Sequence, residues 1–428
     1  MSRDPEVGDA ANALGEDEED NGAIERQETM GSFRGCCGLG WPRSRVTRVL
    51  YTVYFVATMI WAYAMRTWGD SVWQPDDECG EDCVGVIAVY RVAMATVVFH
   101  AVLLLVVFGV NSSSNPRARF QNRLWLPKFL ILVGLVAGFS FVPAKMLNKF
   151  GTAAIVFGVV WILVQTLLLV AITHDIAESW LDKWQDGNTR YRNLVILCSL
   201  VFLGFCVGSS AWLLSNRTSG TGCRKNTVFV VVNLCLSLLN LLLSVSPVVQ
   251  THNSRSGLLQ STMIAAYTTY LVLSAIASEP VNDEMQCRES DDNSALAQVA
   301  RWVGVLFTML AITRAIFATT GKITRSGEDD ASTQRMEDGL VVVEVDDEKD
   351  HVEYSYSFFH FVFVCAAFYT AAVFTNWVTT VSSDSNDTIE VDQGMGAVWA
   401  KMGASWGVHV LYAWTLLAPV LFPDRDFS

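Results

Sequence analysis

Long apolar blocks alternate with short polar stretches along most of the chain. A helix needs about 20 mostly apolar residues to cross a bilayer, whose hydrocarbon core is about 30 Å thick. Backbone polar groups find no water there, so blocks of this length must be helical. The ten blocks lie at residues 46–65, 87–109, 125–142, 152–174, 193–214, 227–247, 258–277, 298–318, 356–380 and 397–421. The pattern predicts an all-α, polytopic integral membrane protein with about ten transmembrane helices and no strands.

The composition agrees with a membrane protein, and the charged residues are unevenly distributed along the chain. Hydrophobic residues make up 51% of the 428 residues and charged residues 17%, whereas soluble proteins contain about 25% charged residues. The net charge of −13 is concentrated in two segments: residues 1–30 hold ten acidic residues against two basic ones, and residues 320–355 hold eleven against four. We therefore expect an acidic disordered cytosolic tail over 1–33. The membrane domain then covers 34–428 and includes an acidic cytosolic loop over 319–355.

Lysine and arginine counts predict the orientation. With a cytosolic N-terminus, the inner segments carry twenty Lys and Arg residues and the outer segments carry nine. Positive residues accumulate in cytosolic loops, so both termini are expected in the cytosol. The first 30 residues are acidic rather than basic and then apolar, so no cleavable signal peptide is expected.

Two further signals agree with this orientation. The sequons at Asn216 and Asn386 fall in outer loops, where glycosylation occurs, whereas a third sequon at Asn111 falls inside. Four cysteines also fall in outer loops, where oxidising conditions permit disulfides. They are Cys79, Cys83, Cys223 and Cys287. Cys79–Cys83 and Cys223–Cys287 are candidate pairs, but sequence does not determine connectivity, and free thiols or another pairing remain open.

Metalloprotease and nucleotide-binding motifs are not found in the sequence. It contains no His-Glu-x-x-His and no phosphate-binding Gly-x-x-x-x-Gly-Lys. No cluster of aspartates with metal-binding spacing occurs at a predicted membrane surface. We therefore expect a protein that is not an enzyme and that needs no cofactor or metal.

Ionisable residues within membrane spans suggest function by default. Arg91 lies about one turn inside the second block, and Glu279 ends the seventh block at a similar depth. Since a buried arginine is costly unless paired, Glu279 is the candidate partner for a buried ion pair. The alternative is that Arg91 reaches the outer head groups while Glu279 faces water.

Polar side chains in the sixth and seventh blocks form a second candidate site. Asn233 and Asn240 are seven residues apart and share one helix face, and Gln260 opens the next block. Most such residues make interhelical hydrogen bonds. The alternative is a polar path for lipid head groups.

At the inner end of the fourth block, His174, Asp175 and Glu178 fit either a metal or proton-relay site or, more commonly, an interfacial helix end.

Several irregular stretches resemble the serine incorporator family of membrane proteins, also described as the TMS or TDE family. The resemblance runs from about residue 34 to the end. It rests on CCG at 36–38, AVYR at 88–91, SSSNPRARFQNRLWLPKF at 112–129, SRSGLLQS at 254–261, YTTYL at 267–271, SEP at 278–280, YSYSFFHFVF at 354–363, TNW at 375–377 and WTLLAPVLFPDRDF at 414–427.

This resemblance implies ten helices in two subdomains, with a long helix crossing the bundle. It implies a role in serine incorporation into phosphatidylserine and sphingolipids, in passive phospholipid scrambling, or in both. The implied partners are membrane phospholipids, serine and further copies of the chain, with no nucleic acid, in an endomembrane or the plasma membrane. An alternative is a secondary transporter of a small polar solute, since two halves of five spans would be inverted relative to each other.

Overall fold

The computed structural model describes most of the membrane domain. The described residues are 43–72, 81–147, 149–218, 223–252, 257–279, 293–317, 348, 352, 354–382, 389–392 and 395–422. The tail over 1–33 and most of the loop over 319–355 therefore lie outside the described residues.

The described chain is almost entirely helical, as predicted. Its elements in order are α2 (Arg43–Val72), α3 (Glu81–Val106), α4 (Ala118–Asn122), α5 (Trp125–Phe139), the 3₁₀ turn η1 (Ala144–Leu147), α6 (Phe150–Gln185), α7 (Thr189–Asn216), α8 (Arg224–Val245), α9 (Pro247–His252), α10 (Leu258–Ala277), α11 (Asn293–Phe317), α12 (Tyr356–Phe374), β1 (Thr379–Ser382), β2 (Ile389–Asp392) and α13 (Met395–Leu421).

Each of the ten predicted blocks coincides with a helix. Eight helices within the described ranges are long and apolar enough to cross a membrane. The helix α5 has 15 residues and extends only about 22 Å at 1.5 Å per residue, which is less than the thickness of the bilayer core. The multi-pass architecture is thus confirmed, while the count of ten crossings stays a prediction.

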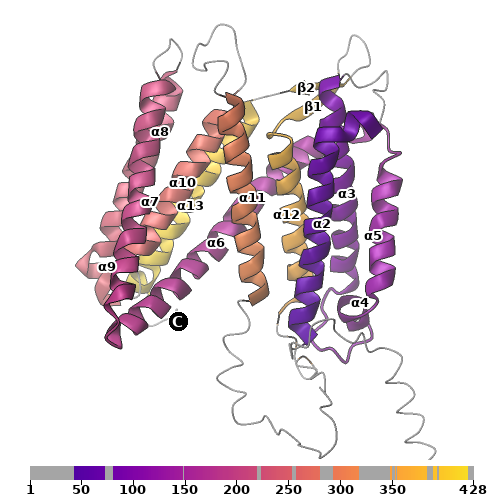
Figure 1. The fold of residues 1–428 in the computed structure, drawn as a ribbon. Helices are drawn as coiled ribbons and strands as arrows, with labels where there is room; N and C mark the ends of the chain where they lie inside the picture. Colours follow the sequence, from indigo (N-terminus) through magenta and orange to yellow (C-terminus); the bar gives the residue numbers. More distant parts are fainter. Residues whose placement is uncertain are drawn as a thin grey trace, which may run out of the picture.

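Two groups of helices pack on either side of a long diagonal helix (Figure 1). The first group contains α2, α3, α4, α5 and α12, and the second contains α7, α8, α9, α10 and α13. The 36 residues of α6 would extend about 54 Å, which exceeds the bilayer core, so α6 must tilt. It contacts α12 of the first group and α7, α10 and α13 of the second, while α11 packs between the groups.

Burial separates core helices from helices that face lipid. Nearly every side chain of α10 and α12 is buried, whereas α7 is exposed along most of its length. The exposed side chains of α7 are mainly apolar, including Leu197, Leu200 and Val201. Apolar residues exposed on a membrane helix contact lipid chains, so α7 forms part of the outer surface.

The described strands correct the prediction that the chain needs none. Strands β1 and β2 form an antiparallel ribbon in which Thr379 pairs with Asp392 and Ser382 pairs with Ile389. The predicted ninth block ran to residue 380, but α12 ends at Phe374. Asn376 and Trp377 then adopt left-handed φ angles of 56° and 61°, and the Trp377 N–H donates to the Ala372 carbonyl. This bond and these angles are typical of a Schellman helix end.

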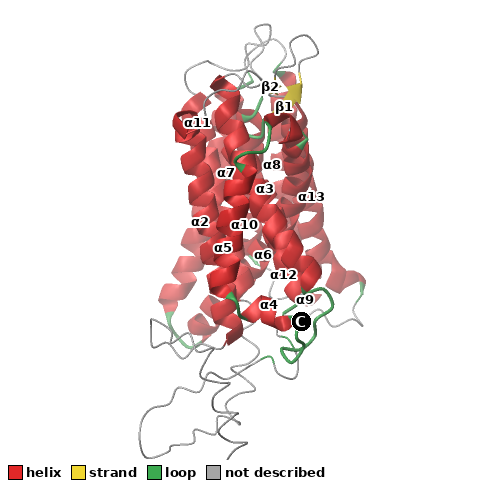
Figure 2. Ribbon diagram, turned by 90° about the vertical axis from the view of Figure 1, so that its right-hand side faces the viewer, coloured by secondary structure: helices red, strands yellow, loops and turns green. Residues whose placement is uncertain are grey.

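The ends of the bundle are distinct. The start of α2, the end of α13, α4 and α9 lie at one end, and the β-ribbon lies at the other (Figures 1 and 2). The arrangement fits an even number of crossings. Which end faces the cytosol stays a prediction from the charge count.

Candidate functional site

Three helices of the second group, α8, α10 and α13, pack against one another and bury polar side chains between them. Together with residues at their ends, these side chains form a line that we call the polar file. It consists of Lys225, Asn226, Glu279, Ser278, Ser274, Lys401, Thr269, Asn233, Ser405, His409, Asn240, Ser261, Tyr412, Gln260 and His174.

The middle of the polar file is centred on His409. The Asn240 amide Nδ2 lies 3.1 Å from His409 Nδ1, and His409 Nε2 lies 3.1 Å from Asn233 Oδ1. An amide nitrogen is a donor and an amide oxygen is an acceptor, so a neutral His409 with its proton on Nε2 satisfies both contacts. The Asn233 amide also donates to Thr269 Oγ1 at 3.1 Å, and Ser405 Oγ donates to Asn233 Oδ1 at 3.4 Å. This arrangement connects all three helices.

Toward the ribbon end, the polar file contains a buried lysine. Lys401 is only 2% exposed. Its ammonium donates to the Ser274 carbonyl at 2.9 Å and to Ser278 Oγ at 2.6 Å, and it lies 4.7 Å from the centre of the Trp377 ring. These oxygen and aromatic contacts partly replace the hydration that the ammonium loses on burial.

An ion pair ends the polar file on this side. Glu279, at the end of α10, is buried and contacts Lys225 Nζ through Oε1 at 3.0 Å. Its other oxygen, Oε2, accepts a hydrogen bond from Asn226 Nδ2 at 2.9 Å. Both partners belong to the first turn of α8. The carboxylate therefore links the start of α8 to the end of α10.

At the opposite end, the polar file reaches α6. Ser261 and Tyr412 share a hydrogen bond of 2.8 Å between their hydroxyl groups. Gln260 Nε2 lies 3.4 Å from Nδ1 of His174, near the end of α6. Ser278 follows Gln260 by 18 positions, which corresponds to about 27 Å along a helix. The file thus extends over nearly the full thickness of a bilayer core.

The predicted ion pair between Arg91 and Glu279 is wrong. Arg91 lies on α3 in the first helix group, and its guanidinium donates to the Val142 carbonyl through Nε at 3.2 Å and Nη2 at 3.0 Å. Glu279 belongs to the second group and pairs with Lys225. Similar depth in the membrane does not place two residues side by side, because sequence leaves open which helices are neighbours.

Other predicted residues fall near the helix ends. Asp175 forms an ion pair with Arg314 of α11 at 2.7 Å, whereas His174 joins the polar file. The described residues hold no group of three or more His, Cys, Asp and Glu side chains that could bind a metal. Asn216 is exposed and ends α7, while Asn386 lies outside the described residues. Glycosylation therefore stays a prediction at both positions.

The cysteines divide between the spans and the helix starts. Cys198, Cys206, Cys235 and Cys365 are free thiols within membrane helices. Cys83 and Cys223, at the starts of α3 and α8, are disulfide-bonded. Their predicted partners, Cys79 and Cys287, lie outside the described residues. The two pairings therefore stay predictions.

Comparison with known proteins identifies the family of this chain. Residues 26–425 match the family model described as Serine incorporator (Serinc), which covers nearly the whole chain. The chain belongs to the serine incorporator family.

Proteins named as serine incorporators are similar to this chain along most of their own length. "Serine incorporator 3" of Mus musculus is 30% identical over 92% of this chain and 94% of its own. "Serine incorporator 2" of Homo sapiens is 32% identical over 84% and 83%. "Probable serine incorporator" of Nematostella vectensis is 30% identical over 90% and 92%. The two helix groups and the crossing α6 agree with the arrangement that the sequence resemblance implied.

The contribution of α13 to this serine incorporator was missed from the sequence. Lys401 is one of the nine Lys and Arg residues that the charge count assigns to the outer segments, although it falls within the predicted block 397–421. The rule that ionisable residues within spans suggest function also applies to Lys401 and His409, and it would have selected both. Sequence spacing did place Asn233 and Asn240 on one face of α8, but only the packing shows that this face meets α13.

Proposed function

We propose that this serine incorporator is a non-catalytic facilitator that moves phospholipid head groups between the two leaflets along the polar file. The observation that carries the proposal is the series of hydrogen-bonded polar clusters along α8, α10 and α13, which supplies hydrogen-bonding groups at depths where lipid supplies none. Moving head groups, or presenting serine at the membrane, would in turn support the incorporation of serine into phosphatidylserine and sphingolipids.

Head-group movement requires the polar file to open toward lipid. Its members bond to one another within each cluster, and the central ones are buried, so the file is closed. The opposite face of α8 carries exposed apolar residues, including Leu238, Leu239 and Leu242, and so contacts lipid. A separation of α8 from α13 would bring the file to the lipid boundary. A head group could then exchange hydrogen bonds with Asn233, Asn240 and His409 while its acyl chains stay in hydrocarbon.

Facilitation fits the geometry better than catalysis. A serine nucleophile needs a neighbouring base within hydrogen-bond reach. Ser405 Oγ instead donates to Asn233 Oδ1, and both nitrogens of His409 are engaged by asparagine amides. The serine and histidine of the file thus lie close together without forming an activated pair.

A secondary transporter of a small polar solute is the second candidate, and the buried Lys401 favours it. Charged groups within membrane proteins commonly bind substrates or coupling ions. A transporter coupled in this way requires an ion gradient, whereas passive lipid movement does not. Comparing activity with and without a gradient in the same vesicles therefore separates the two functions.

The decisive experiment uses the full chain in vesicles with labelled phosphatidylcholine in both leaflets. A membrane-impermeant quencher reports lipid that reaches the outer leaflet. A triple variant, Asn233→Leu, Asn240→Leu and Gln260→Leu, removes the amide side chains from the middle and the α6 end of the file and should slow lipid movement strongly. The matched control is Gln165→Leu, because Gln165 is equally buried but bonds to Tyr267 between α6 and α10, outside the file.

The outcomes separate the alternatives when both variants keep the wild-type size-exclusion profile. Slow movement in the triple variant with normal movement in the control supports the path. Normal movement in the triple variant rules out this file as the path. Loss of wild-type movement on adding a chelator would contradict facilitation without a metal.

A further inference from the structure

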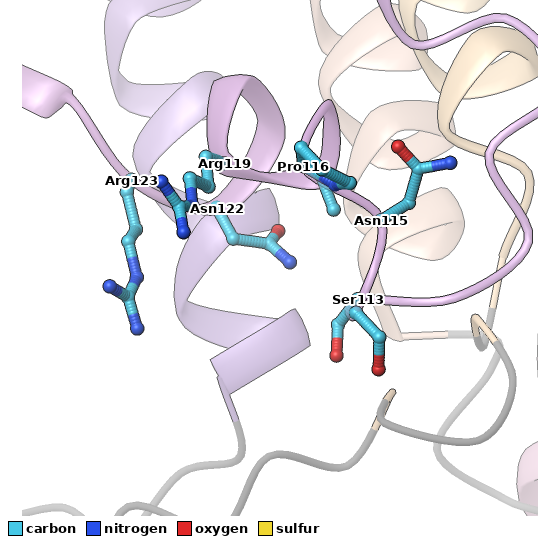
Figure 3. Close-up of a pocket in the computed structure, with 8 residues that line it drawn as sticks. Ser113, Asn115, Pro116, Arg119, Asn122 and Arg123 are labelled. Carbon is cyan, nitrogen blue, oxygen red and sulfur yellow. The ribbon is translucent and has the colours of Figure 1, made fainter.

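A polar cavity lies far from the polar file, beside α4 in the first helix group (Figure 3). Its volume is about 220 Å³, and a water molecule takes about 30 Å³ of liquid volume, so it has room for several waters or one small polar group. One wall is the turn from Ser113 to Pro116, and the other contains Arg119, Asn122 and Arg123.

Two residues that line this cavity, Ser113 and Asn122, are held in place by hydrogen bonds to Glu348. Ser113 N–H donates to the Glu348 carbonyl at 3.0 Å. The Glu348 carboxylate accepts from Asn122 Nδ2 at 3.3 Å and from the Tyr356 hydroxyl at 2.6 Å, and Glu348 is fully buried. These bonds link the turn, α4 and the start of α12. The cavity is therefore part of the folded framework, and the Glu348 carboxylate that bonds to Asn122 already accepts from two donors.

The cavity is lined by positive charge that has no acidic partner among the described side chains. Arg119 and Arg123 are four residues apart, and both side chains lie on the same side of the cavity (Figure 3). Both are exposed, and the ion pairs within the described ranges are Lys225–Glu279 and Arg314–Asp175. Arginine forms paired hydrogen bonds with phosphate oxygens. Ser113 and Ser114 line the opposite wall.

The surroundings of the cavity place it at a membrane surface. It lies at the end of the bundle where α2 begins and α13 ends (Figure 1). The exposed apolar side chains of Phe120, Leu124 and Leu126 alternate with the arginines along this segment. Segments that combine exposed apolar and basic residues lie in the interfacial region and are attracted to anionic lipids. The charge count predicts that this end faces the cytosol.

We propose that this cavity binds the phosphate head group of an anionic phospholipid in the cytosolic leaflet, with Arg119 and Arg123 contacting the phosphate oxygens. The site is separate from the polar file and does not depend on the proposed lipid movement. A bound lipid would connect the turn after α3 to α4, and through Glu348 to the start of α12. Lipid composition could thereby stabilise the first helix group.

Calorimetric titration of the purified full chain in detergent tests this assignment. The probes are short-chain phosphatidic acid, short-chain phosphatidylcholine and inorganic phosphate. Phosphatidic acid should bind, and the double variant Arg119→Gln, Arg123→Gln should bind it about 30-fold more weakly, since each arginine near an anionic lipid surface contributes roughly fivefold. The matched control is Arg190→Gln, Arg192→Gln, which removes two exposed charges at the start of α7 in the other helix group.

Each outcome has a defined meaning. Weaker binding in the Arg119, Arg123 variant with unchanged binding in the control supports the site. Equal weakening in both variants shows general electrostatic attraction and overturns it. Inorganic phosphate binding as tightly as phosphatidic acid overturns the lipid assignment in favour of a free anion, and equal binding of phosphatidylcholine overturns the preference for an anionic lipid. Because the arginines are exposed, the variants should keep the wild-type size-exclusion profile.

Discussion

Replacing Lys401 with methionine tests how the buried ammonium contributes to the protein. The ammonium donates two hydrogen bonds, to Ser274 and Ser278, and lies over the Trp377 ring. Hydrogen bonds from a charged donor contribute about 1.5–3 kcal/mol each, and a desolvated cation–π contact contributes about 2 kcal/mol. Burying an ion costs several kcal/mol, even after relaxation. The favourable and unfavourable contributions are therefore similar in size.

Lys401→Met should accordingly change the free energy of unfolding by no more than about 2 kcal/mol in either direction. Methionine keeps most of the side-chain volume, and the Ser274 carbonyl keeps its bond from Ser278 Oγ at 3.0 Å. Lys401→Ala should cost about 2–5 kcal/mol, because it leaves a cavity in the α10–α13 packing. In the vesicle assay, Lys401→Met should slow lipid movement if the polar file is the path.

Thermal unfolding of the purified variants in one detergent gives the order of stability. Wild type and Lys401→Met should unfold at similar temperatures, and Lys401→Ala should unfold at a clearly lower one. The reasoning is refuted if Lys401→Met is as unstable as Lys401→Ala. That result would mean that the ammonium itself, rather than the volume of the side chain, stabilises the contact between α10 and α13.

Three further predictions concern other parts of the molecule. In a double-mutant cycle of Glu279→Gln and Lys225→Met, thermal unfolding should show a coupling of about 1–3 kcal/mol, and additive effects would show that the 3.0 Å contact contributes nothing. Gly304→Ala should destabilise the folded protein by about 1–3 kcal/mol, because a Cβ would lie 2.6 Å from the Tyr270 hydroxyl. Adding Tyr270→Phe should recover part of this loss in a thermal scan, and no recovery would rule out this clash. Asn216→Gln should abolish one glycosidase-sensitive mobility shift in a eukaryotic host, and an unchanged shift would contradict an outer position for the end of α7.

The pattern of apolar residues determined the helices but not all of their ends. Hydrophobic length alone located the ten helices, since the bilayer imposes the same requirement on each segment. It could not end the ninth block at Phe374, because residues 375–380 contain no charged residue, glycine or proline that would mark a helix end. The end there depends on the left-handed Asn376 and Trp377 and on the packing of the Trp377 ring against Gly158 of α6.

The sequence also determined which residues were candidates, whereas the tertiary structure decided which of them meet. Helical spacing placed Asn233 and Asn240 on one face, because residues seven apart are two turns apart on any helix. Depth in the membrane could not pair Arg91 with the right partner, since residues on ten helices share that depth. Only the packing of α8, α10 and α13 brings Glu279 to Lys225 and the asparagines to His409. Which helices pack together depends on contacts between segments far apart in the sequence, and no local pattern encodes those contacts.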